Sequence, residues 1–167
     1  MGKTLYLLRH GVAESGHGKA DEDRALTPEG VQGILLVARA LGRMGGRVER
    51  IVSSPLLRTR QTADTIRNEL PVTEPVVESD VLRPGADAVQ VVAECQAHSD
   101  VSTLLLVGHL PDLSGVLGYL VSGHPTGAFG FQPGSIARID FQGAVRPSFG
   151  VVRWLLAPEQ LQALVKL

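Results

Sequence analysis

The chain has 167 residues, 44% of them hydrophobic, and a formal net charge of −1, which indicates a folded protein with a sizeable core. The nearly neutral charge argues against broad electrostatic binding to nucleic acid or to an anionic membrane, but a local cluster of arginines can still bind a small anion. Cys95 is the only cysteine, so neither a disulfide framework nor a thiolate metal cluster is expected.

No interdomain linker, internal repeat or low-complexity tract interrupts the sequence, and we expect one domain over residues 1–167. The chain enters a strand pattern at once, without a signal peptide, and its apolar runs are too short to span a bilayer. These features predict a soluble, cytoplasmic protein that does not associate with membranes.

The first predicted element is a strand that ends in polar residues. Residues 5–8 (Leu-Tyr-Leu-Leu) form a continuous apolar run, typical of a strand buried on both faces of a parallel sheet. Arg9 and His10 then lie at the carboxyl end of this strand, where open α/β sheets place their ligands. Gly11 permits a sharp turn and close approach of a bound group to the backbone. Taken alone, these residues are equally compatible with an ordinary strand end.

A polar loop and a packing helix follow. Residues 12–24 predict a loop on the rim of the crevice, with Glu14 and His17 favoured as solvated side chains. Thr27 as N-cap and Pro28 at the first helical position predict a helix. Apolar residues at helical spacing continue to residue 41, and the glycine at position 42 is expected to end this helix.

The next strand and helix bring an arginine towards the same edge of the sheet. Residues 47–53 contain a short strand, and residues 53–55 (Ser-Ser-Pro) predict the start of a helix, with serine as the N-cap and proline just inside. Arg58 then lies in the first turn of a helix that extends to about residue 70, within reach of His10. The helix N-terminus adds N–H donors and partial positive charge, so a phosphate or another oxyanion fits this edge.

A further strand and helix lead to the second histidine. Residues 76–77 predict a brief strand, and Asp87 predicts the N-cap of a helix over residues 88–97. Asp80 and Asp87 are the acids near this loop, and capping or solvation is favoured for them over proton donation. Residues 102–107 predict a second buried strand that delivers His109 directly after its last apolar positions.

The remaining segments are expected to complete the sheet. A helix is predicted from residues 110–111 (Leu-Pro) onwards, followed by a glycine- and proline-rich loop over residues 123–134. Strands at residues 135–141 and 151–156 are expected to pair as an antiparallel hairpin, and a last helix is predicted over residues 159–167.

The sequence resembles the histidine phosphatase superfamily, which also contains the phosphoglycerate mutases. Four blocks carry the resemblance in the order of the family: residues 8–11 (Leu-Arg-His-Gly), 26–30 (Leu-Thr-Pro-Glu-Gly), 53–63 (Ser-Ser-Pro-Leu-Leu-Arg-Thr-Arg-Gln-Thr-Ala) and 107–109 (Val-Gly-His). The small size, residues 82–87 and residues 108–111 look most like its SixA-type phosphohistidine phosphatases. The resemblance implies a phosphoglycerate mutase-like, three-layer α/β/α sandwich with a mostly parallel central sheet.

The resemblance also implies roles for individual residues. His10 matches the nucleophilic histidine, Arg9 its phosphate-binding neighbour, Arg58 the arginine after the serine-proline block, and His109 the second histidine. Arg9, Arg58, His109 and Gly11 are accordingly expected to bind the substrate.

These roles agree with the chemistry of phosphoryl transfer. A neutral His10 can attack phosphorus through one ring nitrogen and form a phosphohistidine that water hydrolyses, while a backbone carbonyl holds the other nitrogen. Arg9, Arg58 and a cationic or hydrogen-bond-donating His109 stabilise the phosphoryl oxygens. No metal or other cofactor is expected, because the arginines supply the positive charge and the sequence has no carboxylate–histidine cluster with metal-ligand spacing.

One departure from the family pattern bears on the substrate. Many phosphoesterases and mutases of the superfamily carry a proton-donating glutamate in a Leu-x-Glu pattern, and residues 82–84 here are Leu-Arg-Pro. An alkoxide leaving group needs a general acid, whereas an imidazole leaving from a P–N bond needs much less help. The short connection between the second helix and His109 also leaves no room for a long lid. Both features favour phosphohistidine as the substrate. Phosphoesters stay an alternative, because Asp80 or Asp87 could move in as the proton donor.

The sequence therefore predicts a phosphatase that acts on phosphohistidine in a partner protein, such as a phosphotransfer domain or a phosphocarrier, and releases inorganic phosphate. Its alternatives are a small-molecule phosphomonoesterase (less favoured, a mutase) and a phosphate-binding module without catalysis. A nucleic-acid-binding module is disfavoured by the neutral charge and the scarcity of aromatic residues.

Overall fold

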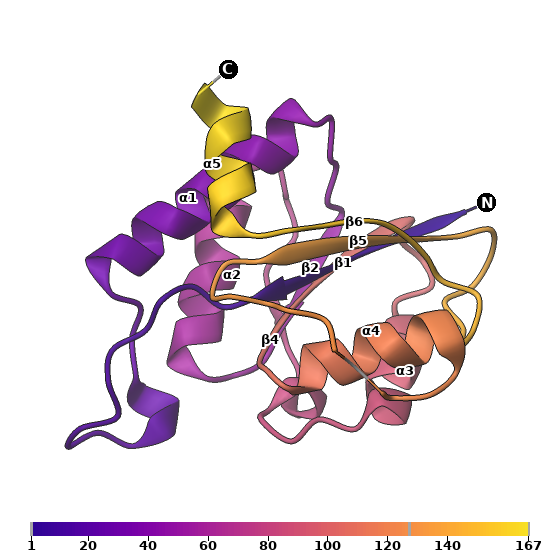
Figure 1. Ribbon diagram of the computed structural model, residues 1–167, viewed down its shortest axis with the longest axis horizontal. Helices are drawn as coiled ribbons and strands as arrows, with labels where there is room; N and C mark the ends of the chain where they lie inside the picture. Colours follow the sequence, from indigo (N-terminus) through magenta and orange to yellow (C-terminus); the bar gives the residue numbers. More distant parts are fainter. Residues whose placement is uncertain (1, 127, 167) are drawn as a thin grey trace.

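A mixed sheet forms the centre of the computed structural model, which describes residues 2–126 and 128–166 (Figure 1). Within these residues the sheet has six strands in the order β3-β2-β4-β1-β5-β6. Their bounds are β1 Lys3–Arg9, β2 Arg50–Ser53, β3 Val77–Glu78, β4 Thr103–Gly108, β5 Ile136–Phe141 and β6 Val151–Leu156. The pairs β1·β4, β2·β4 and β2·β3 are parallel, whereas β5 is antiparallel to both β1 and β6. The mostly parallel sheet and the β5–β6 hairpin are as predicted.

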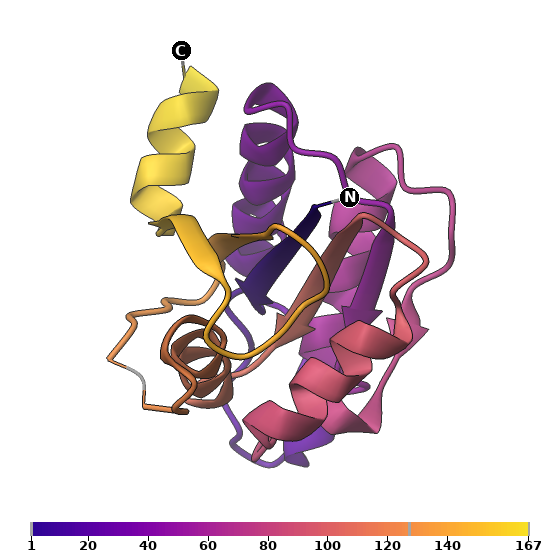
Figure 2. The ribbon, with the colours of Figure 1, turned by 90° about the vertical axis from the view of Figure 1, so that its right-hand side faces the viewer.

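Helices cover both faces of this sheet. The α-helices are α1 Pro28–Arg43, α2 Leu57–Glu69, α3 Ala88–Ala97, α4 Asp112–Ser122 and α5 Pro158–Lys166, and two short 3-10 turns are η1 Asp21–Asp23 and η2 Asp80–Leu82. Figures 1 and 2 show α1, α2 and α5 on one face and α3 and α4 on the other. The predicted three-layer α/β/α arrangement is therefore confirmed. The last position of the predicted terminal helix, residue 167, lies outside the described residues.

Strand β1 is buried on both faces, which explains its continuous apolar run. Leu5 and Leu7 pack into the core beneath α3 and α4, whereas Tyr6 and Leu8 pack into the core beneath α1, α2 and α5. All four side chains are at most 2% exposed. Burying side chains of this kind contributes about 1.5–3 kcal/mol each, so this central strand is firmly held and its carboxyl end has a fixed position.

Two of the three predicted N-caps are confirmed, and one is wrong. The Thr27 side chain accepts from the N–H of Gly30, and the Asp87 side chain caps α3. Helix α2, however, begins at Leu57, and its N-cap residue Leu56 makes no side-chain capping bond. The chain remains extended past Ser53 because the next residue still pairs with β4, its N–H donating to the carbonyl of Val107 at 3.1 Å. The serine before the proline is therefore available for another contact.

The loop after α4 returns to the carboxyl end of β1. The N–H of Gly134 donates to the carbonyl oxygens of Arg9 (3.1 Å) and His10 (3.0 Å), and the N–H of Arg9 donates to the carbonyl oxygen of Ser135 (3.0 Å). Backbone hydrogen bonds thus fix the turn that carries the Arg-His pair. None of the helices in the described residues combines the length and the apolar character needed to cross a membrane.

Candidate active site

The two predicted site histidines leave the sheet at the same edge. Strands β1 and β4 are parallel neighbours, with Arg9 opposite Gly108, so His10 and His109 follow directly at adjacent strand ends. Their ring centroids are 5.3 Å apart, and the ring planes are inclined by 57°. The carboxyl ends of the parallel strands form the crevice that this fold class offers to ligands.

His10 is held as a neutral ring with one nitrogen fixed. Its Nδ1 lies 2.8 Å from the carbonyl oxygen of Gly11, and since a carbonyl only accepts, Nδ1 carries the proton and the Nε2 lone pair is available. Burial lowers the pKa of His10 to about 4, and the positive charges of Arg58, Arg9 and Arg24 act in the same direction. At neutral pH the ring is therefore an uncharged nucleophile with its lone pair on a defined atom.

Arg58 links the two histidines through one guanidinium group. Its Nε donates to Nε2 of His10 (3.3 Å), and its Nη2 lies 3.5 Å from Nδ1 of His109. The carbonyl oxygen and the carboxylate of Asp21 accept from Nη1 (2.7 Å) and Nη2 (3.0 Å). The first turn of α2 thus places a buried cation against both rings, as the sequence predicted for this arginine.

His109 is also neutral. Its Nε2 lies 2.9 Å from the hydroxyl oxygen of Ser54. Because Nδ1 faces a guanidinium, which can only donate, the ring proton is on Nε2 and is donated to Ser54. Burial, followed by His10 and Arg58, lowers the pKa of His109 to about 3. Of the two expected forms of this residue, the neutral hydrogen-bonding ring agrees with these contacts and the cation does not.

Positive charge accumulates around the histidine pair. Arg9 donates through Nη1 to the carbonyl of Phe131 (2.7 Å), while its Nε is buried and has no hydrogen-bond partner in the described part of the chain. Burial and then the neighbouring Arg58 lower the pKa of Arg9. Arg24, from the end of the rim loop, donates to Asp21 at 2.9 Å. Three guanidinium groups and a buried unpaired donor are suited to a multiply charged oxyanion.

Gly11 serves a packing purpose in this structure. A Cβ atom at this position would lie 2.9 Å from Cγ1 of Ile34 and 3.0 Å from the carbonyl oxygen of Gly30, both in α1. Its N–H donates to the hydroxyl of Thr62 at 3.1 Å. The close approach is therefore to a helix, and the expected approach of a bound group to Gly11 remains a prediction.

The acids considered as proton donors are engaged elsewhere. The Asp80 carboxylate accepts from Arg83 at 2.7 Å and is largely exposed, and Asp87 accepts from the first N–H groups of α3. Neither hydrogen-bonds to His10 or His109 within the described residues. The structure therefore brings together the predicted arginines and histidines, and it leaves these two acids outside the cluster.

Four residues that contact this cluster were not identified from the sequence: Asp21, Arg24, Ser54 and Thr62. Asp21 begins the three-residue turn η1 and Arg24 directly follows this turn, which is too short for periodicity to indicate direction. The serine was interpreted as a helix cap, and the threonine belongs to the buried face of α2, where it looks like an ordinary core residue. A charged run next to a predicted phosphate site is the one signal that could have indicated the loop pair.

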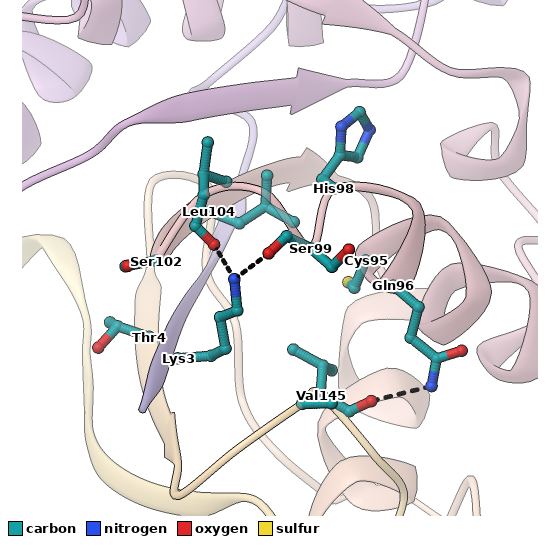
Figure 3. Close-up of a pocket in the computed structure, with 11 residues that line it drawn as sticks. Lys3, Thr4, Cys95, Gln96, His98, Ser99, Ser102, Leu104 and Val145 are labelled. Atoms are coloured by element: carbon teal, nitrogen blue, oxygen red, sulfur yellow. Dashed lines mark hydrogen bonds between the residues drawn. The ribbon is translucent and has the colours of Figure 1, made fainter. Parts of the chain in front are cut away.

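A separate cavity of about 260 Å³ lies at the opposite, amino end of β1 (Figure 3). Its walls are mainly apolar, and the Lys3 ammonium group donates to the carbonyl oxygens of Ser99 and Val101. Burial raises the pKa of the Cys95 thiol to about 12, so this thiol is unreactive at neutral pH. Among the described residues, no group of three or more His, Cys, Asp or Glu side chains could hold a metal ion.

Comparison with known proteins identifies relatives of the chain. Residues 5–83, which include His10 and Arg58, match the family model of the histidine phosphatase superfamily (branch 1). The phosphohistidine phosphatase SixA of Escherichia coli is 31% identical over 120 residues, covering 71% of this chain and 71% of that protein. The mitochondrial serine/threonine-protein phosphatase PGAM5 of Xenopus tropicalis is 35% identical over 84 residues, which cover 50% of this chain and 30% of that longer protein.

The fold has a similar counterpart among solved structures. The protein histidine phosphatase SixA complexed with tungstate superposes with a TM-score of 0.85 and 26% sequence identity, over 95% of this chain and 99% of that one. The similarity thus extends well beyond residues 5–83, over nearly the whole described chain.

Proposed function

Because the chain belongs to the histidine phosphatase superfamily and resembles its SixA members in sequence and fold, we propose that it hydrolyses phosphohistidine in a partner protein. The phosphoglycerate mutase-like fold predicted from the sequence is confirmed by this membership. In the proposed reaction the phosphoryl group passes through a covalent phosphohistidine intermediate on His10.

The observation that carries the proposal is the set of contacts around the His10 ring. Nδ1 is committed to the carbonyl of Gly11, so Nε2 holds the lone pair, and Arg58 donates to that lone pair from 3.3 Å. A phosphoryl group that enters here exchanges this weak hydrogen bond for a P–N bond and places its oxygens against the same guanidinium. The low pKa of His10 keeps the nucleophile uncharged at neutral pH.

The reaction then proceeds in two displacements. As Nε2 of His10 bonds to phosphorus, the P–N bond of the substrate breaks and its imidazole leaves, taking a proton from solvent. Water next attacks the phosphorylated His10, releasing inorganic phosphate and restoring the neutral ring. Arg9 and Arg58 stabilise the phosphoryl oxygens in both steps, which is the main contribution that a protein makes to phosphoryl transfer.

The surroundings of the site favour a P–N over a P–O substrate. Proline occupies position 84, where phosphoesterases of the superfamily carry the donor glutamate, and the side chains of Asp80 and Asp87 are bound elsewhere. Hydrogen bonding by Arg24 and Arg58 lowers the pKa of Asp21, so this carboxylate is ionised at neutral pH and cannot act as a general acid. An alkoxide leaves poorly under these conditions, whereas an imidazole ring is basic enough to be protonated from solvent and then leaves as a neutral ring without a positioned donor.

The comparisons support the same choice. The SixA relatives carry names that specify phosphohistidine or protein histidine, and one of them binds tungstate, a tetrahedral oxyanion like phosphate. The serine/threonine phosphatase match covers only half of this chain, and it is the reason to include a phosphoester in the assay. We infer that the partner is a phosphotransfer domain or a phosphocarrier, and that residues 1–167 act as one domain in the cytoplasm.

The test is a comparison of two substrates and three proteins. Wild type, His10→Ala and His17→Ala are incubated with a phosphohistidine-bearing protein and with p-nitrophenyl phosphate; His17 is an exposed loop histidine and serves as the matched control. We expect wild type to prefer the P–N substrate. We expect His10→Ala to lose turnover and His17→Ala to keep the turnover of wild type. Preference for the ester would instead establish a phosphomonoesterase, and phosphate binding without turnover would establish a binding module.

A further inference from the structure

One carboxylate lies among the arginines of the site. Asp21, at the start of η1, accepts from Arg58 through both its carbonyl oxygen (2.7 Å) and its Oδ2 (3.0 Å), and from Arg24 through its Oδ1 (2.9 Å). Within residues 2–126 and 128–166, no other carboxylate hydrogen-bonds to Arg9, Arg24 or Arg58. Asp21 is therefore an internal counter-anion whose two oxygens bridge two guanidinium groups.

The donors that hold this carboxylate are the ones that a phosphoryl group needs. Arg58 Nη2 faces both Oδ2 of Asp21 and Nδ1 of His109, so it lies between the counter-anion and the histidine pair. A phosphoryl group that binds beside His10 uses the same guanidinium group, whose positive charge the Asp21 carboxylate already partly neutralises. The Asp21 side chain is 57% exposed, so it can turn towards solvent at little cost when it is displaced.

The main-chain carbonyl of Asp21 holds Arg58 independently of the charge on the Asp21 side chain. Arg58 Nη1 donates to this carbonyl, and a main-chain acceptor is still present when the side chain is substituted. Removing the carboxylate charge therefore leaves the guanidinium anchored through Nη1, while it raises the positive potential of the site.

We propose that Asp21 sets the anion affinity of the site: its carboxylate competes with phosphate for Arg58 and Arg24, weakens the binding of inorganic phosphate and thereby speeds product release. This inference rests on the proposed function, since it assumes that a phosphoryl group binds beside His10. Asp21 is a positioning and affinity-determining residue here, and it forms no bond to the reacting atoms.

Asp21→Asn tests the inference with a well-matched control. The substitution keeps the size of the side chain and one acceptor oxygen while removing the charge. Asp23→Asn removes the same charge from the same turn, where the side chain is exposed and has no polar partner among the described residues. Asp21→Glu retains a carboxylate and is expected to retain weak binding. Thermal unfolding of each variant establishes that all are folded.

The measurement is calorimetric titration with inorganic phosphate, together with product inhibition of turnover. We expect Asp21→Asn to bind phosphate about tenfold more tightly than wild type, equivalent to about 1.4 kcal/mol, because the variant no longer has a negative charge that repels the anion and neutralises its donors. It should also be inhibited by correspondingly less phosphate. Asp23→Asn is expected to change affinity by less than about twofold, since an exposed charge is screened.

The outcomes also separate this inference from the proposed function. Binding by Asp21→Asn that is equal to or weaker than that of Asp23→Asn would overturn the role of the counter-anion, and weaker binding would mean that the carboxylate supports the site. Absence of phosphate binding in every protein, or binding that Arg58→Ala does not reduce, would instead refute the phosphate site itself.

Discussion

Replacing Arg58 by alanine separates catalysis from stability at this site. The guanidinium donates to His10 Nε2 and to two oxygens of Asp21, and it lies 3.5 Å from His109. Removal of one preorganised donor to a developing oxyanion typically lowers kcat by about 10²–10³, or about 2.7–4 kcal/mol. Arg58 is a charged donor shared by both displacements, so we expect a loss in this range for Arg58→Ala.

The free energy of unfolding should change much less than kcat in Arg58→Ala. Burying a guanidinium costs free energy that its hydrogen bonds only partly offset, and the Asp21 carboxylate left behind is more than half exposed and can be solvated. We therefore expect the free energy of unfolding to change by about 1 kcal/mol or less. The control is Arg60→Ala, two residues further along α2, where the exposed side chain has Glu78, at 3.5 Å, as its one ion-pair partner in the described part of the chain.

The assay is steady-state hydrolysis of a phosphohistidine-bearing protein, with urea unfolding of the same preparations. Arg58→Lys should recover only part of the activity, because an ammonium group cannot bind phosphoryl oxygens in the bidentate manner of a guanidinium. If Arg58→Ala retained kcat within a few-fold of Arg60→Ala, the assignment of Arg58 to transition-state stabilisation would be wrong. A loss of activity that merely followed loss of folded protein would refute it as well.

Three further predictions concern residues around the site. The folded-state pKa of His10 is lowered from 6.5 to about 4, so its contribution to stability is fully present above pH 6.5 and is lost as pH falls towards 4. Urea unfolding at pH 7 and pH 4 should therefore show about 3 kcal/mol more acid destabilisation in wild type than in His10→Gln. An equal loss of stability in both proteins would contradict the neutral His10 ring. Ser54→Ala removes the acceptor of the His109 ring proton and should lower kcat about tenfold, equivalent to one hydrogen bond, whereas unchanged kinetics would exclude a positioning role. Asp87→Ala should destabilise the protein by about 1 kcal/mol through loss of the α3 cap, and its kcat should be unchanged. A lower kcat for an ester substrate would instead indicate that Asp87 acts as a proton donor.

The features of the fold that follow from short-range patterns were predictable from the sequence. Apolar runs mark β1 and β4, and a capping residue marks the start of α1 and of α3. That His10 and His109 lie at the same edge also follows, because the parallel strands of an α/β sheet present their carboxyl ends at one edge. What the sequence left open at that edge was the protonation of His109, which depends on burial and on the direction of each ring nitrogen.

The parts that could not be predicted depend on tertiary contacts of irregular segments. The contacts between Asp21 and Arg58 arise from the 3-10 turn η1, which is too short to show a repeat from which to infer direction. Ser54 illustrates a competing choice: a serine before a proline is a good helix cap in isolation, but continued pairing with β4 keeps it extended and its hydroxyl meets His109 instead. In both cases the deciding partner is distant in sequence.

The proposed reaction requires that His10 carry the phosphoryl group during turnover. It is tested most directly by mixing the protein with a phosphohistidine-bearing substrate, quenching in base to preserve P–N bonds, and locating the phosphoryl group by mass spectrometry of peptides. We expect transient phosphorylation on His10 alone, at Nε2, and no phosphorylation in His10→Ala. A phosphoryl group on His109 or on another residue, or hydrolysis that proceeds at the wild-type rate in His10→Ala, would contradict it.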